Sequence, residues 1–434
     1  MNCFSKSYLK SLPRDIRLKQ RYRAEKRFRA YGYTAIGIGV FFLTALLWSI
    51  FSQGYTAFWQ TSITLPVKLD VAVIDPQNRR DKNPQILITA NYPVLIRNAL
   101  AEKLGIAIDD YIGLRELNHM ISPSAGIKLR KMVLDNPQII GSTQSLTVLA
   151  GADIDSAFKG KINLTVSEIS RKISNRQIKW MYKLAAEGSL YKAFNTGLFI
   201  FASSSRPETS GLGVALIGSF YMILIVLMFS LPIGVATAIY LEEYARKNRF
   251  TDLIEININN LAAVPSIVFG LLGVSVFINF FGLPRSSSLV GGLVLTLMTL
   301  PIIIIATRSA LRAVPISIRS AALGVGASKI QMVFQHVLPL AAPGILTGTV
   351  IGLTRALGET APLLLIGMVA FIANYPRTLM DPATALPVQI YMWANESERA
   401  FIERTSGAII VLLMFLAVIN TIAVLLRRRF EQHR

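Results

Sequence analysis

Six long apolar stretches punctuate the chain of 434 residues, and polar or charged segments separate them. They lie at roughly 33–52, 212–240, 261–281, 288–307, 344–372 and 407–426. A helix needs about 20 apolar residues to cross the hydrocarbon core of a bilayer. The pattern therefore predicts an all-α polytopic membrane protein with six transmembrane helices.

The segment 53–206, between the first two apolar stretches, is too polar to cross a membrane. In ITLPVKLDVAV (63–73) the aliphatic side chains from Ile63 to Val73 alternate with other residues, which is typical of a half-buried strand. VLIRNALAEKLGI (94–106) and NRQIKWMYKLAAEG (175–188) have helical patterns that Gly105 and Gly188 would end. We expect a small α+β domain here; a poorly ordered insert is the alternative.

Composition supports insertion in a membrane, since 52% of the residues are hydrophobic and only 16% are charged. The net charge of +20 lacks the basic stripe with interleaved aromatic residues that nucleic-acid binders use, so lipid head groups are the expected counter-ions. The single Cys3 excludes an internal disulfide, and the three histidines (His119, His336, His433) are far apart in the sequence. We expect neither a metal site nor a cofactor.

Charge asymmetry predicts the orientation. The amino-terminal segment 1–32 carries ten cations between Lys6 and Arg29, the loop 308–343 carries four cations and no acid, and the tail 427–434 is basic. The segment 373–406 holds three cations and four acids. Because cytoplasmic loops are enriched in Lys and Arg, both termini are expected in the cytoplasm and 53–206 outside. The slightly acidic loop 242–260 does not fit this rule. No small-residue cleavage pattern follows the first span (33–52), so we interpret it as an uncleaved anchor.

No enzymatic motif is evident. The string closest to a phosphate-binding loop, GVGASKI (324–330), lacks the glycine that should directly precede Lys329. Neither a G-x-S-x-G elbow nor an H-E-x-x-H helix occurs. We predict that the chain does not hydrolyse ATP itself and is not an enzyme.

Two opposite charges interrupt the fifth apolar stretch. In TRALGETAPLLLIG (354–367), Arg355 and Glu359 are four residues apart and would lie on one face of a helix. A charge at the middle of a membrane is costly unless it is paired or faces water. The two residues either neutralise each other and fasten the span to a neighbour, or line a water-filled path.

The polar segment 313–343 joins the fourth and fifth spans. Ser320, Ala321 and Ala322 are expected to start a short helix, and Gly324 and Gly326 permit a bend after it. An apolar stripe then follows, which we expect to end at Leu338 and Pro339. It consists of Ile330, Val333, Phe334 and Val337. Such a unit can dock in a groove of another protein or lie on the membrane as an amphipathic helix.

This segment resembles the EAA loop of ABC-importer permeases. The matching residues are Ser320, Ala321, Ala322, Gly326, His336, Leu338 and Pro339, of which Ser320 and His336 depart from the usual pattern. In that family the loop docks in a cleft of a separate ATP-binding subunit, which agrees with the missing nucleotide motif. The resemblance implies that 207–426 is the permease core, with helices 2–6.

Further strings resemble the phosphate-import permeases, the PstA family, in its long form with an amino-terminal extension. They are PETSGLGVALIGSF, LPIGVATAIYLEEYA, AAVPSIVFGLLGVSVF, RALGETAPLLL and ALPVQIYMWA, in the expected order. The companion PstC permeases share the loop and the Arg-to-Glu segment, but the APLL and ALPVQIY strings favour PstA. The resemblance implies a bacterial inner membrane location and three partners: a PstC-like permease, a PstB-like ATP-binding dimer and an external PstS-like phosphate-binding protein.

By this resemblance Arg355 and Glu359 would line a substrate path between two permeases, where a guanidinium suits phosphate oxygens. The family often has a second path arginine at the position that Ile305 holds in this chain. Arg308, one helical turn later, either substitutes for that arginine or only anchors the cytoplasmic end of the span. Two alternatives remain open: a permease for another oxyanion such as sulfate or molybdate, and a membrane-anchored sensor or scaffold.

Overall fold

The structure is a computed structural model that describes residues 13–76, 85–107, 109–168, 171–369 and 371–432. The first 12 residues of the basic amino terminus, Cys3 among them, and His433 lie outside these ranges. The chain forms two compact units, 1–53 and 54–434, each described by itself.

Helix α1 (Pro13–Gly54) makes up the described part of the first unit. It is one continuous helix whose first half is basic and whose second half is apolar, and it contains the predicted span 33–52. At about 1.5 Å per residue its 42 residues exceed what a bilayer core requires.

The second unit begins with a three-stranded antiparallel sheet in the order β2-β1-β3. The strands are β1 (Trp59–Lys68), β2 (Thr143–Leu149) and β3 (Leu190–Phe194). Ile63 pairs with Val148 on one side of β1 and with Leu190 on the other. Ile63, Leu65 and Val67 are fully buried, which confirms the alternation over this part of the predicted strand.

Short helices surround this sheet, and together they form the sheet domain, residues 55–206. The helices are η1 (Tyr55–Phe58), α2 (Val71–Ile74), α3 (Gln85–Thr89), α4 (Tyr92–Leu104), α5 (Tyr111–Met120), α6 (Ser124–Asp135), η2 (Pro137–Ile139), α7 (Ala152–Phe158), α8 (Asn175–Ala186) and α9 (Gly197–Ile200). The predicted helices 94–106 and 175–188 are confirmed as α4 and α8. Gly105 and Gly188 follow them with positive φ of 73° and 68°.

The predicted strand 63–73 is too long at its end. Asp70 accepts a hydrogen bond from the Ala72 backbone N–H (3.0 Å) and caps α2, so Val71 and Val73 lie in that helix. The domain nevertheless has a continuous apolar core, which confirms its α+β character and excludes a poorly ordered insert for the residues described.

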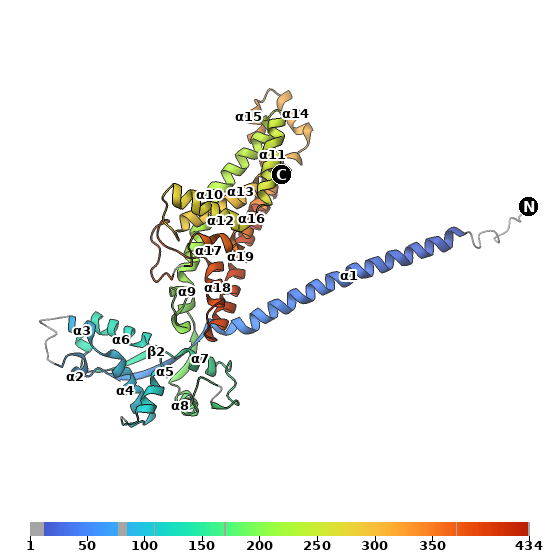
Figure 1. The fold of residues 1–434 in the computed structure, drawn as a ribbon. Coiled ribbons are helices and arrows are strands. Elements are labelled where there is room, and N and C mark those ends of the chain that lie inside the picture. The colour runs from blue at the N-terminus through green and yellow to red at the C-terminus, as the bar shows by residue number, and fades with distance from the viewer. Residues whose placement is uncertain (1–12, 77–84, 108, 169–170, 370, 433–434) are drawn as a thin grey trace, which may run out of the picture. The chain divides into compact units, whose positions relative to one another are not determined.

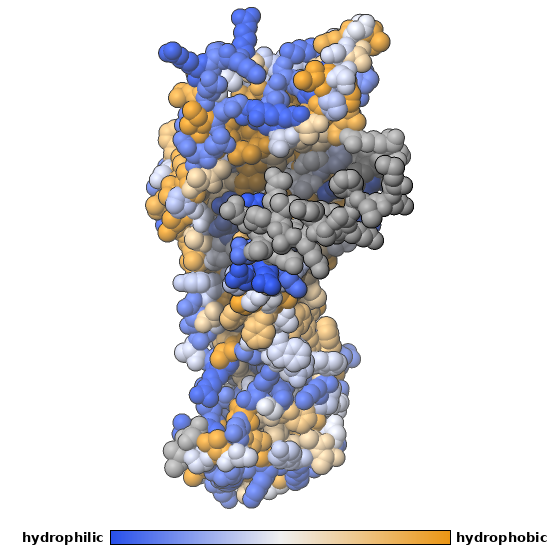
Figure 2. All heavy atoms as spheres, turned by 90° about the vertical axis from the view of Figure 1, so that its right-hand side faces the viewer, coloured by the Kyte–Doolittle hydropathy of each residue, from blue (hydrophilic) through white to orange (hydrophobic). Residues whose placement is uncertain are grey.

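The rest of the second unit is helical. Its helices are η4 (Pro207–Thr209), α10 (Gly213–Ile239), η5 (Tyr240–Tyr244), α11 (Arg249–Ala262), α12 (Ser266–Gly273), η6 (Val274–Phe280), α13 (Ser288–Arg312), α14 (Ile316–Gly324), α15 (Lys329–Gln331), η7 (Met332–Val337), α16 (Leu338–Gly358), α17 (Ala361–Leu365), α18 (Leu386–Ala394) and α19 (Ala400–Gln432). The sheet domain and α14 lie at opposite ends of this bundle (Figure 1). Apolar side chains gather over the bundle between the two ends (Figure 2).

Five helices in the described residues are long and apolar enough to cross a membrane. They are Gln20–Phe58, Gly213–Tyr244, Ser288–Arg312, Lys329–Gly358 and Ala400–Arg429. A sixth span exists only if α11 and the α12–η6 helix, bent by 100° against each other, count as one.

The predicted third span, 261–281, is therefore not one straight helix. Pro265 separates α11 from α12, because it lacks a backbone N–H and disfavours helical backbone at the preceding Val264. As a helix, the segment Ser266–Phe280 would be about 22 Å long, whereas a bilayer core is about 30 Å thick. The predicted loop 242–260 is largely helical, and Asn248 caps α11 by accepting from the Thr251 N–H (2.8 Å).

The predicted fifth span, 344–372, is also wrong at both ends. The helix begins at Lys329 and continues through η7 and α16 to Gly358. Ser328 and Gln331 form a capping box at its start, a signal present in the sequence that we missed. Pro339 does not end this helix, because the wider π-helical turn of η7 precedes it.

Helices α13 and α16 approach each other closely through small residues. Gly344, Gly348 and Gly352 recur every four residues along α16, and a methyl group built on Gly348 would lie 2.1 Å from the Ala306 side chain. A methyl group on Gly344 would lie 2.6 Å from Ala310. Small-residue spacing of this kind lets membrane helices pack backbone to backbone.

A buried ion cluster joins the sheet domain to the bundle. The Lys159 ammonium after α7 lies 2.7 Å from Asp155 and 2.9 Å from Glu403 at the start of α19. All three side chains are about nine-tenths or more buried. Asp155 also accepts from the Thr61 N–H of β1 (2.8 Å), so the cluster links the sheet, α7 and α19.

Polar contacts extend this junction. Glu208 in η4 is buried; its carboxylate accepts from the Ser122 hydroxyl (2.9 Å) and its backbone carbonyl accepts from the Gln60 amide (2.6 Å). Burial raises the pKa of Asp153 in α7 and of Glu398 before α19, and the charge of Lys172 opposes both shifts. The sheet domain is thus attached to the bundle through paired polar groups.

Replacing Lys159 with Ala should leave the Asp155 and Glu403 carboxylates buried without a cation. We expect the unfolding free energy to fall by about 3–5 kcal/mol, measured on the purified chain in detergent. Lys161→Ala, at an exposed position two residues on, is the control and should cost less than about 1 kcal/mol. Equal stability of both variants would show that the cluster does not fasten the two parts together.

Candidate functional site

Arg355 and Glu359 meet at the end of α16. The Arg355 Nε lies 3.7 Å from Glu359 Oε1. Their contact does not depend on one continuous helix, because α16 ends at Gly358 and Glu359 already has extended backbone (φ −80°, ψ 124°). The predicted proximity is therefore present, although the predicted continuous span is not.

Arg355 lies on a face that the other described residues of the second unit leave uncovered, and Glu359 beside it is half-buried. The Arg355 side chain is 49% exposed, and Ile351, one turn earlier, is 59% exposed. Leu353, Ala356 and Leu357 on the other side of α16 are buried in the bundle. No atom lies within 4 Å of a methyl group built on Gly358, so there is open space beside the two charges.

One polar contact joins this region to the last helix. The Thr354 hydroxyl donates to Asn420 Oδ1 of α19 (3.0 Å). A hydrogen bond between apolar helices holds α16 and α19 in register next to the charged pair.

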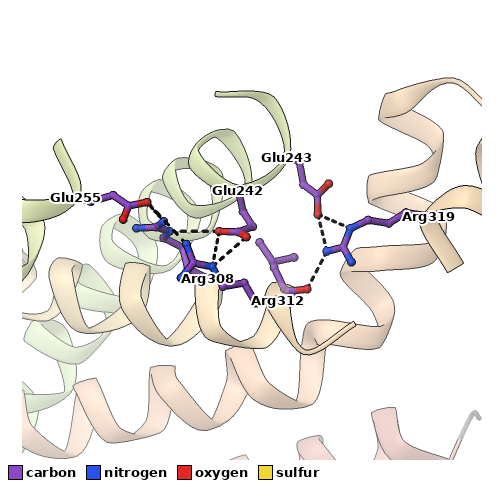
Figure 3. A network of polar contacts seen from close by, with 7 residues as sticks. Glu242, Glu243, Glu255, Arg308, Arg312 and Arg319 are labelled. Carbon is purple, nitrogen blue, oxygen red and sulfur yellow. Dashed lines mark hydrogen bonds and ion pairs between the residues drawn. The ribbon is translucent and has the colours of Figure 1, made fainter. Parts of the chain in front are cut away.

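Arg308, the other candidate, lies elsewhere, in a cluster at the α14 end of the bundle (Figure 3). It is hydrogen-bonded to Glu255 of α11, and its Nε lies 3.6 Å from Glu242 of η5. Arg312 Nε contacts the same Glu242 at 2.9 Å and is more exposed. The family arginine position, Ile305, is 39% exposed. The Arg308 guanidinium is thus already paired with two carboxylates.

The predicted docking loop does form a helix, a break and a second helix. The first helix, α14, starts at Ile316 rather than at Ser320, directly after Pro315 at the N-cap position. Ser320, Ala321 and Ala322 therefore lie inside α14. Gly326 makes the turn with φ +88°.

The predicted apolar stripe divides between the core and the surface. Val333 and Val337 are fully buried, whereas Ile330 and Phe334 are more than half exposed. His336 and Pro339 are exposed and Leu338 is half-buried. The π-helical turn of η7 rotates the stripe, which periodicity of 3.6 residues could not anticipate.

The tip of this loop carries exposed aliphatic side chains at Ile316 (77%), Leu323 (49%), Val325 (84%) and Ile330 (62%). Ser320 and Ala321 are exposed between them. An exposed apolar patch in a polar surround is typical of a surface that binds another protein.

The described residues contain no group of three or more His, Cys, Asp or Glu side chains that could hold a metal ion. Cys3 and His433 are outside those residues.

Comparison with known proteins gives two family matches. Residues 15–168 match a family described as "Domain of unknown function (DUF3333)", and residues 230–434 match "Binding-protein-dependent transport system inner membrane component". The first covers α1 and most of the sheet domain, and the second covers most of the bundle.

Three curated relatives are similar to half of the chain or more. A probable ABC transporter permease protein YqgI of Bacillus subtilis is 30% identical over 51% of this chain and 84% of its own length. A phosphate transport system permease protein PstA of Haemophilus influenzae is 30% identical over 63% and 94%. The PstA 1 protein of Mycobacterium tuberculosis (strain CDC 1551 / Oshkosh) is 33% identical over 51% and 72%.

Replacing Arg308 with Gln should leave Glu242 and Glu255 with only the exposed Arg312 as their cation. We expect the unfolding free energy in detergent to fall by about 1–3 kcal/mol. The double variant Arg308→Gln, Glu255→Gln should recover part of this loss. Arg312→Gln, at an exposed member of the cluster, is the control and should cost about 0–1 kcal/mol. A single variant as stable as the unmodified chain would contradict the anchoring role.

Proposed function

This chain belongs to the PstA family of ABC transporter permeases, and we infer that it is the permease subunit of an ATP-driven importer of inorganic phosphate. It is a multi-pass membrane protein and is not itself an enzyme. Its relatives are permeases, so ATP hydrolysis belongs to a separate subunit.

An ABC permease of a binding-protein-dependent system works with an ATP-binding subunit and an external binding protein. Our proposal for the complete assembly is a second, PstC-like permease, two PstB-like ATP-binding subunits and a PstS-like phosphate-binding protein. The exposed aliphatic tip of 313–343, with Ser320 and Ala321 at its centre, is the proposed docking site for the ATP-binding subunit.

The proposed docking site implies an orientation of the chain in the membrane. ATP is cytoplasmic, so α14 would lie in the cytoplasm together with both termini. The sheet domain, at the opposite end of the bundle, would then lie outside the membrane as an external domain of residues 53–206 (Figure 1). The basic segments 1–32 and 427–434 agree with this orientation.

The single observation that carries the substrate-path proposal is the Arg355–Glu359 pair, whose guanidinium lies on a face that the described residues of the second unit leave uncovered. Charges facing hydrocarbon are costly, so we propose that this face meets water or protein. A second permease packed against it would enclose a path with Arg355 and Glu359 on its wall. Arg355 suits this place because a guanidinium stays charged and offers two parallel N–H donors to phosphate oxygens.

In the proposed mechanism Glu359 neutralises Arg355 while the path is empty. The 3.7 Å contact is loose enough for phosphate oxygens to compete for the guanidinium. The nearby carboxylate repels the bound anion, which keeps binding weak and allows release. ATP binding and hydrolysis in the partner would shift the populations of outward-open and inward-open states.

We place Arg308 outside this path. Its guanidinium contacts Glu242 and Glu255, so a passing anion would have to displace two carboxylates. These contacts support the other role that the sequence left open, in which Arg308 anchors the cytoplasmic end of the span.

Replacing Arg355 with Ala should abolish phosphate uptake while the complex still assembles, because the path loses its anion donor. Uptake of labelled phosphate into proteoliposomes and co-purification of the subunits would measure the two effects. Arg285→Ala is the matched control, since Arg285 is an exposed cation in a loop, and uptake should stay near that of the unmodified complex. Near-normal uptake by the Arg355 variant would refute the pathway role.

Replacing Glu359 with Gln tests the release step separately. Without the repelling charge, phosphate should be held longer, so the maximal uptake rate should fall by about tenfold for a contact of about 1.4 kcal/mol. The readout is the maximal rate with saturating binding protein and ATP. An unchanged rate would leave Arg355 as the anion contact but remove Glu359 from the mechanism.

A further inference from the structure

Arg319 provides the polar attachment of helix α14 to the bundle. Among its nine residues only Ala322 is buried. Arg319 makes four hydrogen bonds: Nε and Nη2 donate to Glu243 Oε1 (3.0 and 2.8 Å), Nη1 donates to the Val314 carbonyl (2.6 Å) and Nη2 to the Leu311 carbonyl (2.8 Å). A push on α14 can therefore reach the bundle through this side chain as well as through the apolar contact of Ala322.

The two carbonyls belong to the end of α13. Leu311 lies in its last turn and Val314 just beyond it, where helix carbonyls lack the regular i+4 partner; the Leu311 carbonyl also accepts from the Val314 N–H (3.2 Å). A cation at this end of a helix is favourable because it satisfies those carbonyls and the helix dipole. Arg319 thereby joins α14 rigidly to the helix that carries Arg308.

Glu243 is the third point of attachment and belongs to a different helix. It lies in η5, a π-helical turn that continues α10, and its side chain is only 7% exposed (Figure 3). Turns of this kind occur frequently at functional sites. One guanidinium therefore connects α14, the end of α13 and the end of α10.

A second contact holds η5 from the other side of the loop. The Lys329 ammonium at the start of the long second helix lies 4.9 Å from the centre of the Tyr244 ring. The apolar cluster beneath includes Leu241 of η5, Ala322 of α14 and Val333 of η7. Both halves of the loop therefore contact η5, one through Glu243 and one through Tyr244.

We propose that Arg319 and Glu243 form a joint that transmits movement of the docked loop to α10 and α13 during transport. Both are positioning residues and neither contacts substrate. The proposal rests on the proposed function, since it needs an ATP-binding subunit that moves α14. The Arg308–Arg312–Glu242–Glu255 contacts beside it do not involve α14, so they stabilise the bundle without carrying this movement.

The test uses the full complex in proteoliposomes and compares phosphate transported with ATP hydrolysed. Arg319→Lys keeps the charge but cannot reach three acceptors at once, and Glu243→Gln removes the charge but keeps the size. We expect each to lower the number of phosphates moved per ATP by about tenfold, with ATP hydrolysis itself within about twofold. The matched controls are Arg312→Lys and Glu242→Gln, which make the same changes next to the joint and should leave the ratio unchanged.

Charge reversal adds a readout that general damage would not produce. Arg319→Glu alone should uncouple transport, and Arg319→Glu combined with Glu243→Arg should recover part of the ratio. The joint is refuted if both conservative variants keep the normal ratio, or if the controls lose as much as they do.

Failure of the proposed function would look different. An unmodified complex that hydrolyses ATP without moving phosphate would refute phosphate import and not the joint. The joint is then tested on the same samples through stimulation of ATP hydrolysis by the external binding protein. The Arg319 and Glu243 variants should lose this stimulation and the two controls should keep it; stimulation retained in all four would refute the joint.

Discussion

The free energy of removing a charge from water governs this molecule, because so many of its charged groups lie in or beside apolar helices. Lys159 is buried between two carboxylates, Arg308 contacts two more, and Arg319 is surrounded by four acceptor contacts. Each cluster joins different helices or joins the sheet domain to the bundle. The same cost singles out the Arg355–Glu359 pair, which is loosely paired and open to one side.

These clusters stabilise different parts of the molecule. The Lys159 cluster holds the sheet domain to α19 at one end, and the five Arg–Glu contacts of η5, α11, α13 and α14 hold the other end together. Between them, the backbone contact of α13 with α16 depends on glycine and alanine and not on charge. A change of state in the proposed cycle must therefore move helices as connected groups, since breaking a buried pair is costly.

Departures from regular helix occur where these groups meet. The π-helical turn η7 lies within the loop 313–343, η5 contacts this loop, and α16 stops at Gly358 beside the charged pair. Prolines account for part of this, since Pro339 and Pro362 remove backbone donors that a regular helix would use. Such irregular backbone is tolerated in a membrane only where protein or water satisfies it, and the proposed path at the α16 end would meet this condition.

Hydrophobic periodicity in the sequence was enough to locate most apolar spans, the strand at Ile63 to Val67 and helices α4 and α8, because burial of one face leaves a regular pattern. The strings around Arg355 and the docking loop identified the family because each is a short continuous stretch of sequence that can be recognised without knowing the fold. Tertiary structure decided what the pattern could not: the bend at Pro265, the end of α16 before Glu359, and the partners of Arg308 and Arg319. Those carboxylates lie some 50 to 76 positions away in the sequence, and only packing of α10 and α11 against α13 and α14 brings them within reach.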